Sequence, residues 1–128
     1  MEVVNLEAAI SSGMKNPKIV QAYVGESPIL ILPQKDSGHS RMLEDFLKAR
    51  SIVYETMPPP NNPQLPFHVP KLEGSNYRVV GMGMMSIDGQ SKQCFGLGGF
   101  SIGYNIGIDK THAKLVREHL ESLGWKFF

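Results

Sequence analysis

The stretch YRVVGMGMMSIDGQSKQCFGLGGFSIGYN, Tyr77 to Asn105, contains two runs rich in apolar and β-branched residues, separated by a turn. Asp88-Gly89 marks the turn, because this pair is typical of β-hairpin loops. The sequence therefore predicts two adjacent antiparallel strands, over residues 77–86 and 93–105. Both runs are rich in glycine. A strand glycine either relieves crowding under a neighbouring element or leaves main-chain N–H groups open to an approaching group, and both interpretations remain open.

Further elements are predicted on both sides of this hairpin. Residues 17–25 and 27–34 have the composition of two strands, and residues 51–57 that of a third. Helical spacing of apolar residues predicts a helix within 36–51, capped by Ser37 or Ser40, and a second from Asp109 or Thr111 to Leu123, followed by a strand at 125–128. We expect a single-domain α/β fold, a mixed β-sheet flanked by two helices, over residues 17–128. Residues 1–16 would form an N-terminal arm or a short helix.

Composition limits the possible functions. The chain has 128 residues and a formal net charge of +1, so it fits one domain and is not expected to bind nucleic acid non-specifically. The lone Cys94 cannot form an internal disulfide, and the N-terminal residues lack the pattern of a secretory signal. No apolar run approaches the roughly 20 residues that cross a bilayer. We expect a soluble, cytoplasmic protein with no membrane contact.

A proline-rich segment, residues 57–70, follows the predicted strand at 51–57. Its six prolines exclude both a helix and a strand ladder, which predicts a long loop of polyproline character. Such a loop could form a lid, present a surface to a partner, or be inert.

His39 is the main candidate for chemistry. It lies at or just before the start of the predicted helix, where free backbone N–H groups and the helix dipole attract an anion. A neutral imidazole at that position could act as a general base, or it could be only a polar residue beside a cap. Ser101 and the glycine-rich turn near Tyr104 could supply further donors to an anion. The other three histidines lack metal-ligand spacing and are expected to be solvated, so no metal or cofactor is predicted.

Four stretches together resemble one known family. GGFSIGYNIGIDKTHAKLVREHL (98–120) is similar to the closing motif of the Janus and phosphohistidine phosphatase family. HSRMLEDF (39–46) is similar to the family segment in which a histidine opens the first helix. GMGMMS (81–86) resembles the family's glycine-rich strand, and KIVQAYV (18–24) resembles its first strand.

The resemblance implies a metal-independent phosphatase that hydrolyses the P–N bond of phosphohistidine in a protein, or of a small phosphoramidate. His39 would be the general base. The main-chain N–H groups of Ser40 and Gly103 and the hydroxyl of Ser101 would hold the phosphoryl oxygens, and Lys18 would supply positive charge.

One position departs from the family pattern. Met84 stands where the family has an arginine, so Arg41 or Arg78 would have to supply the phosphate clamp. The alternative is a non-catalytic module of the same fold that binds a phosphopeptide or nucleotide. A third possibility is a scaffold that docks partners through the proline-rich segment.

Overall fold

A six-stranded mixed sheet forms the centre of the computed structural model, which describes all residues 1–128. Its strands are Glu2–Val4 (β1), Lys18–Val24 (β2), Ser27–Ile31 (β3), Tyr77–Asp88 (β6), Gln93–Gly98 (β7) and Lys126–Phe127 (β10). They lie in the order β1-β3-β2-β6-β7-β10. The two outermost pairs, β1 with β3 and β7 with β10, are parallel, and the inner pairs are antiparallel. This confirms the predicted α/β fold with a mixed sheet, including the hairpin of β6 and β7.

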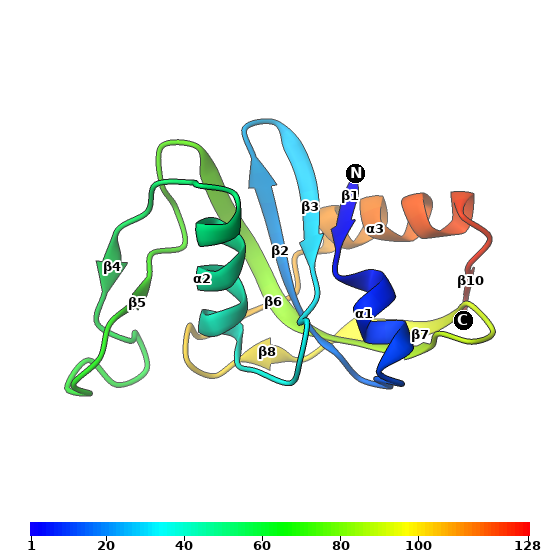
Figure 1. The fold of residues 1–128 in the computed structure, drawn as a ribbon, viewed down its shortest axis with the longest axis horizontal. Helices are drawn as coiled ribbons and strands as arrows, with labels where there is room; N and C mark the ends of the chain where they lie inside the picture. Colours follow the sequence, from blue (N-terminus) through cyan, green and yellow to red (C-terminus); the bar gives the residue numbers. More distant parts are fainter.

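Three helices cover the two faces of the sheet: Leu6–Ser11 (α1), His39–Ala49 (α2) and Lys110–Ser122 (α3). Side chains alternate along a strand, so Ile29 and Ile31 join the core cluster under α2, while Leu30 and Leu32 join the cluster that includes residues of α1 and α3. Figure 1 shows α2 and α3 at opposite ends of the sheet. The third helix, α1, is the short helix that was one of two possibilities for residues 1–16. No helix of the chain combines the length and the apolarity needed to cross a bilayer.

Glycines of β6 allow close packing. A Cβ atom at Gly81 would collide with the side chain of Gln21, and one at Gly83 would collide with the carbonyl of Gly98 and with Ile108. Crowding therefore explains these two glycines. Gly98, by contrast, has open space at the position of a Cβ atom, and Gly99 does too.

A buried polar network fastens α3 to the sheet. Gln21 donates from Nε2 to the carbonyl of Asp109 (3.0 Å) and to Nδ1 of His112 (3.3 Å), and its Oε1 accepts from the Asp109 N–H (2.8 Å). Nε2–H of His112 donates to the carbonyls of Ile29 (3.0 Å) and Ala22 (3.2 Å). His112 is thus fully buried, and the expectation of a solvated side chain was wrong. Burial lowers its pKa.

The second predicted strand of the hairpin is interrupted. β7 ends at Gly98, and Gly99 adopts a left-handed conformation with φ of 74°. The chain then forms Phe100–Ser101 (β8), a turn, and Ile106–Gly107 (β9), which pairs antiparallel with β8. Residues 100–104 therefore leave the β7 ladder and line a hollow together with the N-terminus of α2.

The proline-rich segment begins and ends in a small ladder, which corrects the prediction that its prolines exclude one. Thr56–Met57 (β4) pairs antiparallel with Val69–Pro70 (β5), so the intervening residues form a closed excursion. Pro70 is tolerated because it lies in a two-stranded ladder with no further neighbour. The predicted strand at 51–57 is reduced to β4, and residues 51–55 lie outside any strand. In Figure 1, β4 and β5 lie beyond α2, far from both chain termini.

Candidate functional site

A cavity of about 420 Å³ lies beside the N-terminus of α2. Four segments line it: the start of β2, residues 38–40, part of the proline-rich segment, and residues 100–104. It contains five of the six predicted site residues, namely Lys18, His39, Ser40, Ser101 and Gly103. A hollow of about 500 Å³ at the β6–β7 turn is larger, but none of the six predicted residues lines it. The residues that carry candidate chemistry therefore meet in the smaller cavity.

His39 is the first residue of α2 and is partly buried. Its Nε2 lies 2.9 Å from the carbonyl oxygen of Gly83, so this nitrogen carries the proton and donates it. Nδ1 is then the unprotonated nitrogen, and it has no hydrogen-bond partner within the protein. Burial lowers the pKa of His39, the hydrogen bond to Gly83 partly opposes this, and the charge of Lys18 lowers it further. The imidazole is thus neutral at pH 7, with a free basic nitrogen.

The N-terminus of α2 offers uncommitted backbone donors. The N-cap is Gly38, with no side-chain cap, which corrects the expected capping by Ser37 or Ser40. The first N–H to bond within the helix is that of Met42, to the carbonyl of Gly38. The N–H of Ser40 precedes it and is free of the helix ladder. A glycine cap leaves these donors accessible at the cavity, where the helix dipole favours an anion.

The turn after β8 supplies a second set of hydrogen-bond donors. Ser101 is buried, and its Oγ accepts a hydrogen bond from the N–H of Tyr104 (3.3 Å). The hydroxyl proton of Ser101 is therefore available to a bound group. The N–H of Gly103 makes no backbone hydrogen bond, and a Cβ at Gly103 would meet only the Ser101 Oγ, at 4.0 Å. The N–H of Gly103 is therefore a main-chain donor of the kind that the glycine-rich stretch was expected to provide.

Lys18 is the only charged residue that lines the cavity. Its Nζ lies 3.7 Å from Oδ1 of Asp36, an exposed carboxylate. The neighbouring position on β6 is Met84, which pairs directly with Lys18 and is 42% exposed. This methionine therefore lies on the surface, unlike Met82 and Met85, which are buried in the core.

Neither candidate arginine reaches the cavity. Arg41 follows Ser40 on α2, but its Nε donates to Oδ1 of Asp45 (3.0 Å), and its side chain lines a separate cleft of about 280 Å³. The guanidinium of Arg78 lies 4.2 Å from the centre of the Tyr23 ring. Arg78 is also about 20 Å along β6 from Met84, at roughly 3.3 Å per residue. No arginine therefore lines the cavity.

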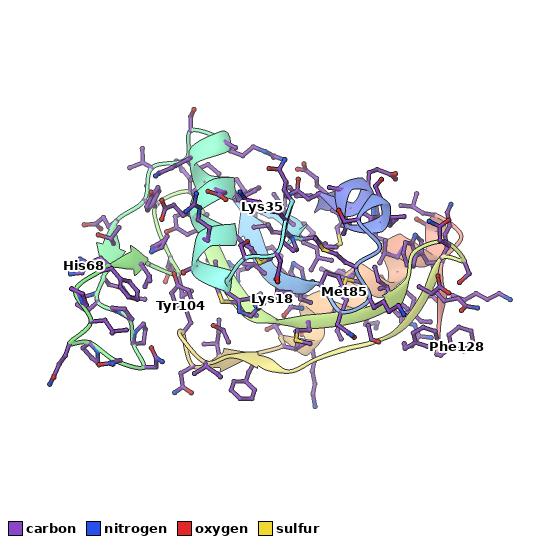
Figure 2. The ribbon with its side chains drawn as sticks, turned by 60° about the horizontal axis from the view of Figure 1, so that its bottom comes forward. Lys18, Lys35, His68, Met85, Tyr104 and Phe128 are labelled. Carbon is purple, nitrogen blue, oxygen red and sulfur yellow. The ribbon has the colours of Figure 1, made fainter.

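The proline-rich segment forms one side of the cavity, through residues that sequence reasoning did not select: Pro59, Asn61, Leu65, Phe67 and Val69. The Tyr104 hydroxyl donates to the carbonyl of Pro70 (2.7 Å), and the N–H of Asn61 donates to the carbonyl of Gly103 (3.3 Å). Figure 2 shows Tyr104 between this segment and the rest of the domain. The only sequence signal for these contacts was the presence of large apolar side chains among the prolines.

Comparison with protein-family models, with curated proteins and with solved structures finds no match to this chain. No three or more histidine, cysteine or acidic side chains converge as they would around a metal ion. The cavity itself is lined by one neutral imidazole, one ammonium group, the hydroxyl-bearing residues Ser40, Ser101 and Tyr104, and several backbone N–H donors. This set can hold an anion and remove a proton from a water molecule beside it.

Proposed function

We propose that this protein is a metal-independent phosphatase that hydrolyses phosphohistidine or a related phosphoramidate, as a member of the Janus and phosphohistidine phosphatase family. The observation that carries the proposal is the cavity that joins His39 to donors from a helix N-terminus and a distant glycine-rich turn. These donors come from segments about 60 residues apart in the chain, yet they line one hollow. The single, buried thiol of Cys94 supports a cytoplasmic location as part of the same proposal.

The geometry supports the following reaction. The N–H groups of Ser40 and Gly103 and the hydroxyl of Ser101 bind the phosphoryl oxygens, and Lys18 offsets their charge. Nδ1 of His39 takes a proton from a water molecule, whose oxygen attacks phosphorus. The P–N bond breaks, and its electron pair goes to the leaving nitrogen, which accepts the proton that His39 took from the water molecule, either directly or through solvent. The products are inorganic phosphate and an unmodified nitrogen group.

Substitution of His39 tests the general base. His39→Ala should lower the turnover of a phosphohistidine protein by about 100-fold or more, the usual loss when a general base is removed. Phosphate release would be measured with a chelator present, and phosphate affinity by calorimetry should change little. His119→Ala is the matched control, since His119 lies on α3, outside the cavity. Equal turnover by His39→Ala and wild type would refute the assignment.

A second function has one specific observation in its favour. Met84 leaves the site without an arginine clamp, and neither Arg41 nor Arg78 lines the cavity. A non-catalytic module that binds a phosphorylated ligand needs fewer charges than a phosphatase, because it stabilises no transition state. Phosphate binding by wild type without any phosphate release would favour this binding module over the phosphatase.

A further inference from the structure

Exposed apolar side chains gather at the mouth of the candidate site. Phe67 is 53% exposed, Phe100 61% and Ile102 70%, and all three line the cavity together with Leu65. We call these four residues the apolar wall. Exposed apolar groups that meet at one hollow beside polar groups are typical of a binding surface, whereas scattered ones are ordinary.

The apolar wall is held in place by the fold. Leu65 and Phe67 belong to the excursion closed by β4 and β5, and Val69 of β5 is buried in the core cluster that also contains Tyr104. The two hydrogen bonds from Tyr104 and Asn61 join this excursion to the turn that carries Ile102. A wall fixed before binding loses little conformational entropy when a ligand packs on it.

The cavity is larger than a phosphoryl group requires. Its volume of about 420 Å³ lies within the range of sites for drug-sized ligands. The anion donors come from Ser40, Ser101 and Gly103, so a ligand held there would leave the apolar wall to contact whatever is attached to the phosphoryl group. Lys18 is the only cation that lines the cavity, and the phosphoryl group would take it as its charge partner, so acidic neighbours in the ligand would find no further one.

We propose that the apolar wall binds a large aliphatic or aromatic side chain next to the phosphorylated residue. The substrate class is then a protein segment in which the phosphohistidine has such a neighbour, rather than a free small phosphoramidate. This inference rests on the proposed function and names the substrate class of the same site. It makes Phe67 and Ile102 residues that determine specificity.

The test measures the affinity of three fluorescent peptides by anisotropy. The first carries a non-hydrolysable phosphonotriazole analogue of phosphohistidine with leucine and phenylalanine neighbours. The second has the same analogue with serine neighbours, and the third has the apolar neighbours without the phosphoryl analogue. The first peptide should bind on the order of tenfold tighter than the second, since burial of one large apolar side chain gives at least this factor.

Two variants locate the effect. In wild type the affinity for the first peptide should exceed the affinity for the second. Phe67→Ser and Ile102→Ser should each bring the ratio of these two affinities close to one. Val53→Ser is the matched control, because Val53 is also apolar and is 75% exposed but lies outside the cavity, and it should keep the ratio. All three side chains are largely exposed, so the variants should fold.

The outcomes separate this inference from the proposed function. Equal affinity for the first and second peptides overturns the role of the apolar wall, even where both peptides bind through their phosphoryl analogue. Equal affinity for the first and third peptides overturns the anion site and therefore the proposed function. If none of the peptides binds, the inference is overturned, and the turnover assay with His39→Ala decides the phosphatase independently.

Discussion

At the scale of single residues, two histidines with lowered pKa values differ in what their ring nitrogens contact. Both nitrogens of His112 make hydrogen bonds within the protein, which fixes the ring as a structural link. His39 has one nitrogen bonded to Gly83 and the other free at a cavity. A lowered pKa alone therefore does not distinguish a structural histidine from a candidate base. A ring nitrogen that has no hydrogen-bond partner within the protein does distinguish them.

Met84 gives a prediction at the same scale. Its side chain shares a sheet face with the directly paired Lys18, and it is exposed enough to be replaced without disturbing the core. Met84→Arg should bind inorganic phosphate about tenfold more tightly than wild type, since a charge-assisted hydrogen bond contributes on the order of 1.5–3 kcal/mol before solvent screening. Isothermal calorimetry would measure the affinity.

Met84→Gln is the matched control for this substitution, because glutamine is similar in length but carries no charge. Its phosphate affinity should stay near that of wild type. If the arginine variant binds phosphate no better than the glutamine variant, the sheet face beside Lys18 is not part of the anion site.

At the scale of elements, local sequence patterns predicted most of the strands and helices. The features that were missed depend on contacts between distant residues. β2, β3, α2, α3 and the β6–β7 hairpin carry their own periodicity and turn residues, and the structure confirms them. β1 was missed, because a three-residue strand has almost no pattern and depends on pairing with β3. The burial of His112 was missed because its partner Gln21 is 91 residues away. Leu65 and Phe67 of the apolar wall were missed because the ladder of β4 and β5 brings them to the cavity.

The proline-rich segment provides a prediction for a whole element. Met57 and Val69 face each other across the β4–β5 ladder, so an Asn-Gly pair in place of residues 58–68 would join them by a two-residue turn. The shortened chain should fold, since β4, β5 and the hydrogen bond from Tyr104 to Pro70 remain. It should bind the apolar-flanked peptide no more tightly than the serine-flanked one, as measured by anisotropy.

A milder replacement controls for damage to the excursion. Substitution of residues 62–64 by Gly-Ser-Gly changes the segment at positions that are exposed and do not line the cavity. This variant should keep the preference for apolar neighbours. Loss of the preference in both variants would mean that the segment acts through its overall shape and not through the apolar wall.

At the scale of the whole molecule, the sheet separates two core clusters, and one histidine lies on each side. One of the two histidines is partly buried and the other is fully buried. His39 contacts β6 from the α2 face, and His112 joins α3 to β2 and β3. The sequence predicted the mixed sheet and its class, and it predicted that the start of the first long helix and the glycine-rich stretch would both supply donors. The order of the strands and the position of α1 beside α3 in one cluster required the structure.

These two histidines predict how the stability of the molecule depends on pH. Both folded-state pKa values lie below the value of about 6.5 in an unfolded chain, mainly because of burial. The unfolded state therefore binds more protons in acid. Stability is fully present above pH 6.5 and is lost as the pH falls toward the lowered folded-state values, by up to about 1.4 kcal/mol per pH unit for each histidine.

Urea unfolding at pH values from 8 to 5 would measure this dependence. The free energy of unfolding should be constant above pH 7 and should fall below pH 6.5. His39→Gln should remove part of the slope, whereas His119→Gln should leave it unchanged, because the His119 side chain makes no hydrogen bond in the core. A free energy that stays constant down to pH 5 would contradict the buried, neutral state of both rings.

The shortness of the two outermost strands has a consequence for crowded solutions. β1 has three residues and β10 has two, so each of these strands presents few free backbone groups to which another chain could add a strand. The longest strand, β6, pairs with β2 over residues 77–84 and with β7 over residues 84–88. Few backbone groups on these two border strands are open to a second copy of the chain, which counts against edge-to-edge aggregation of the folded protein.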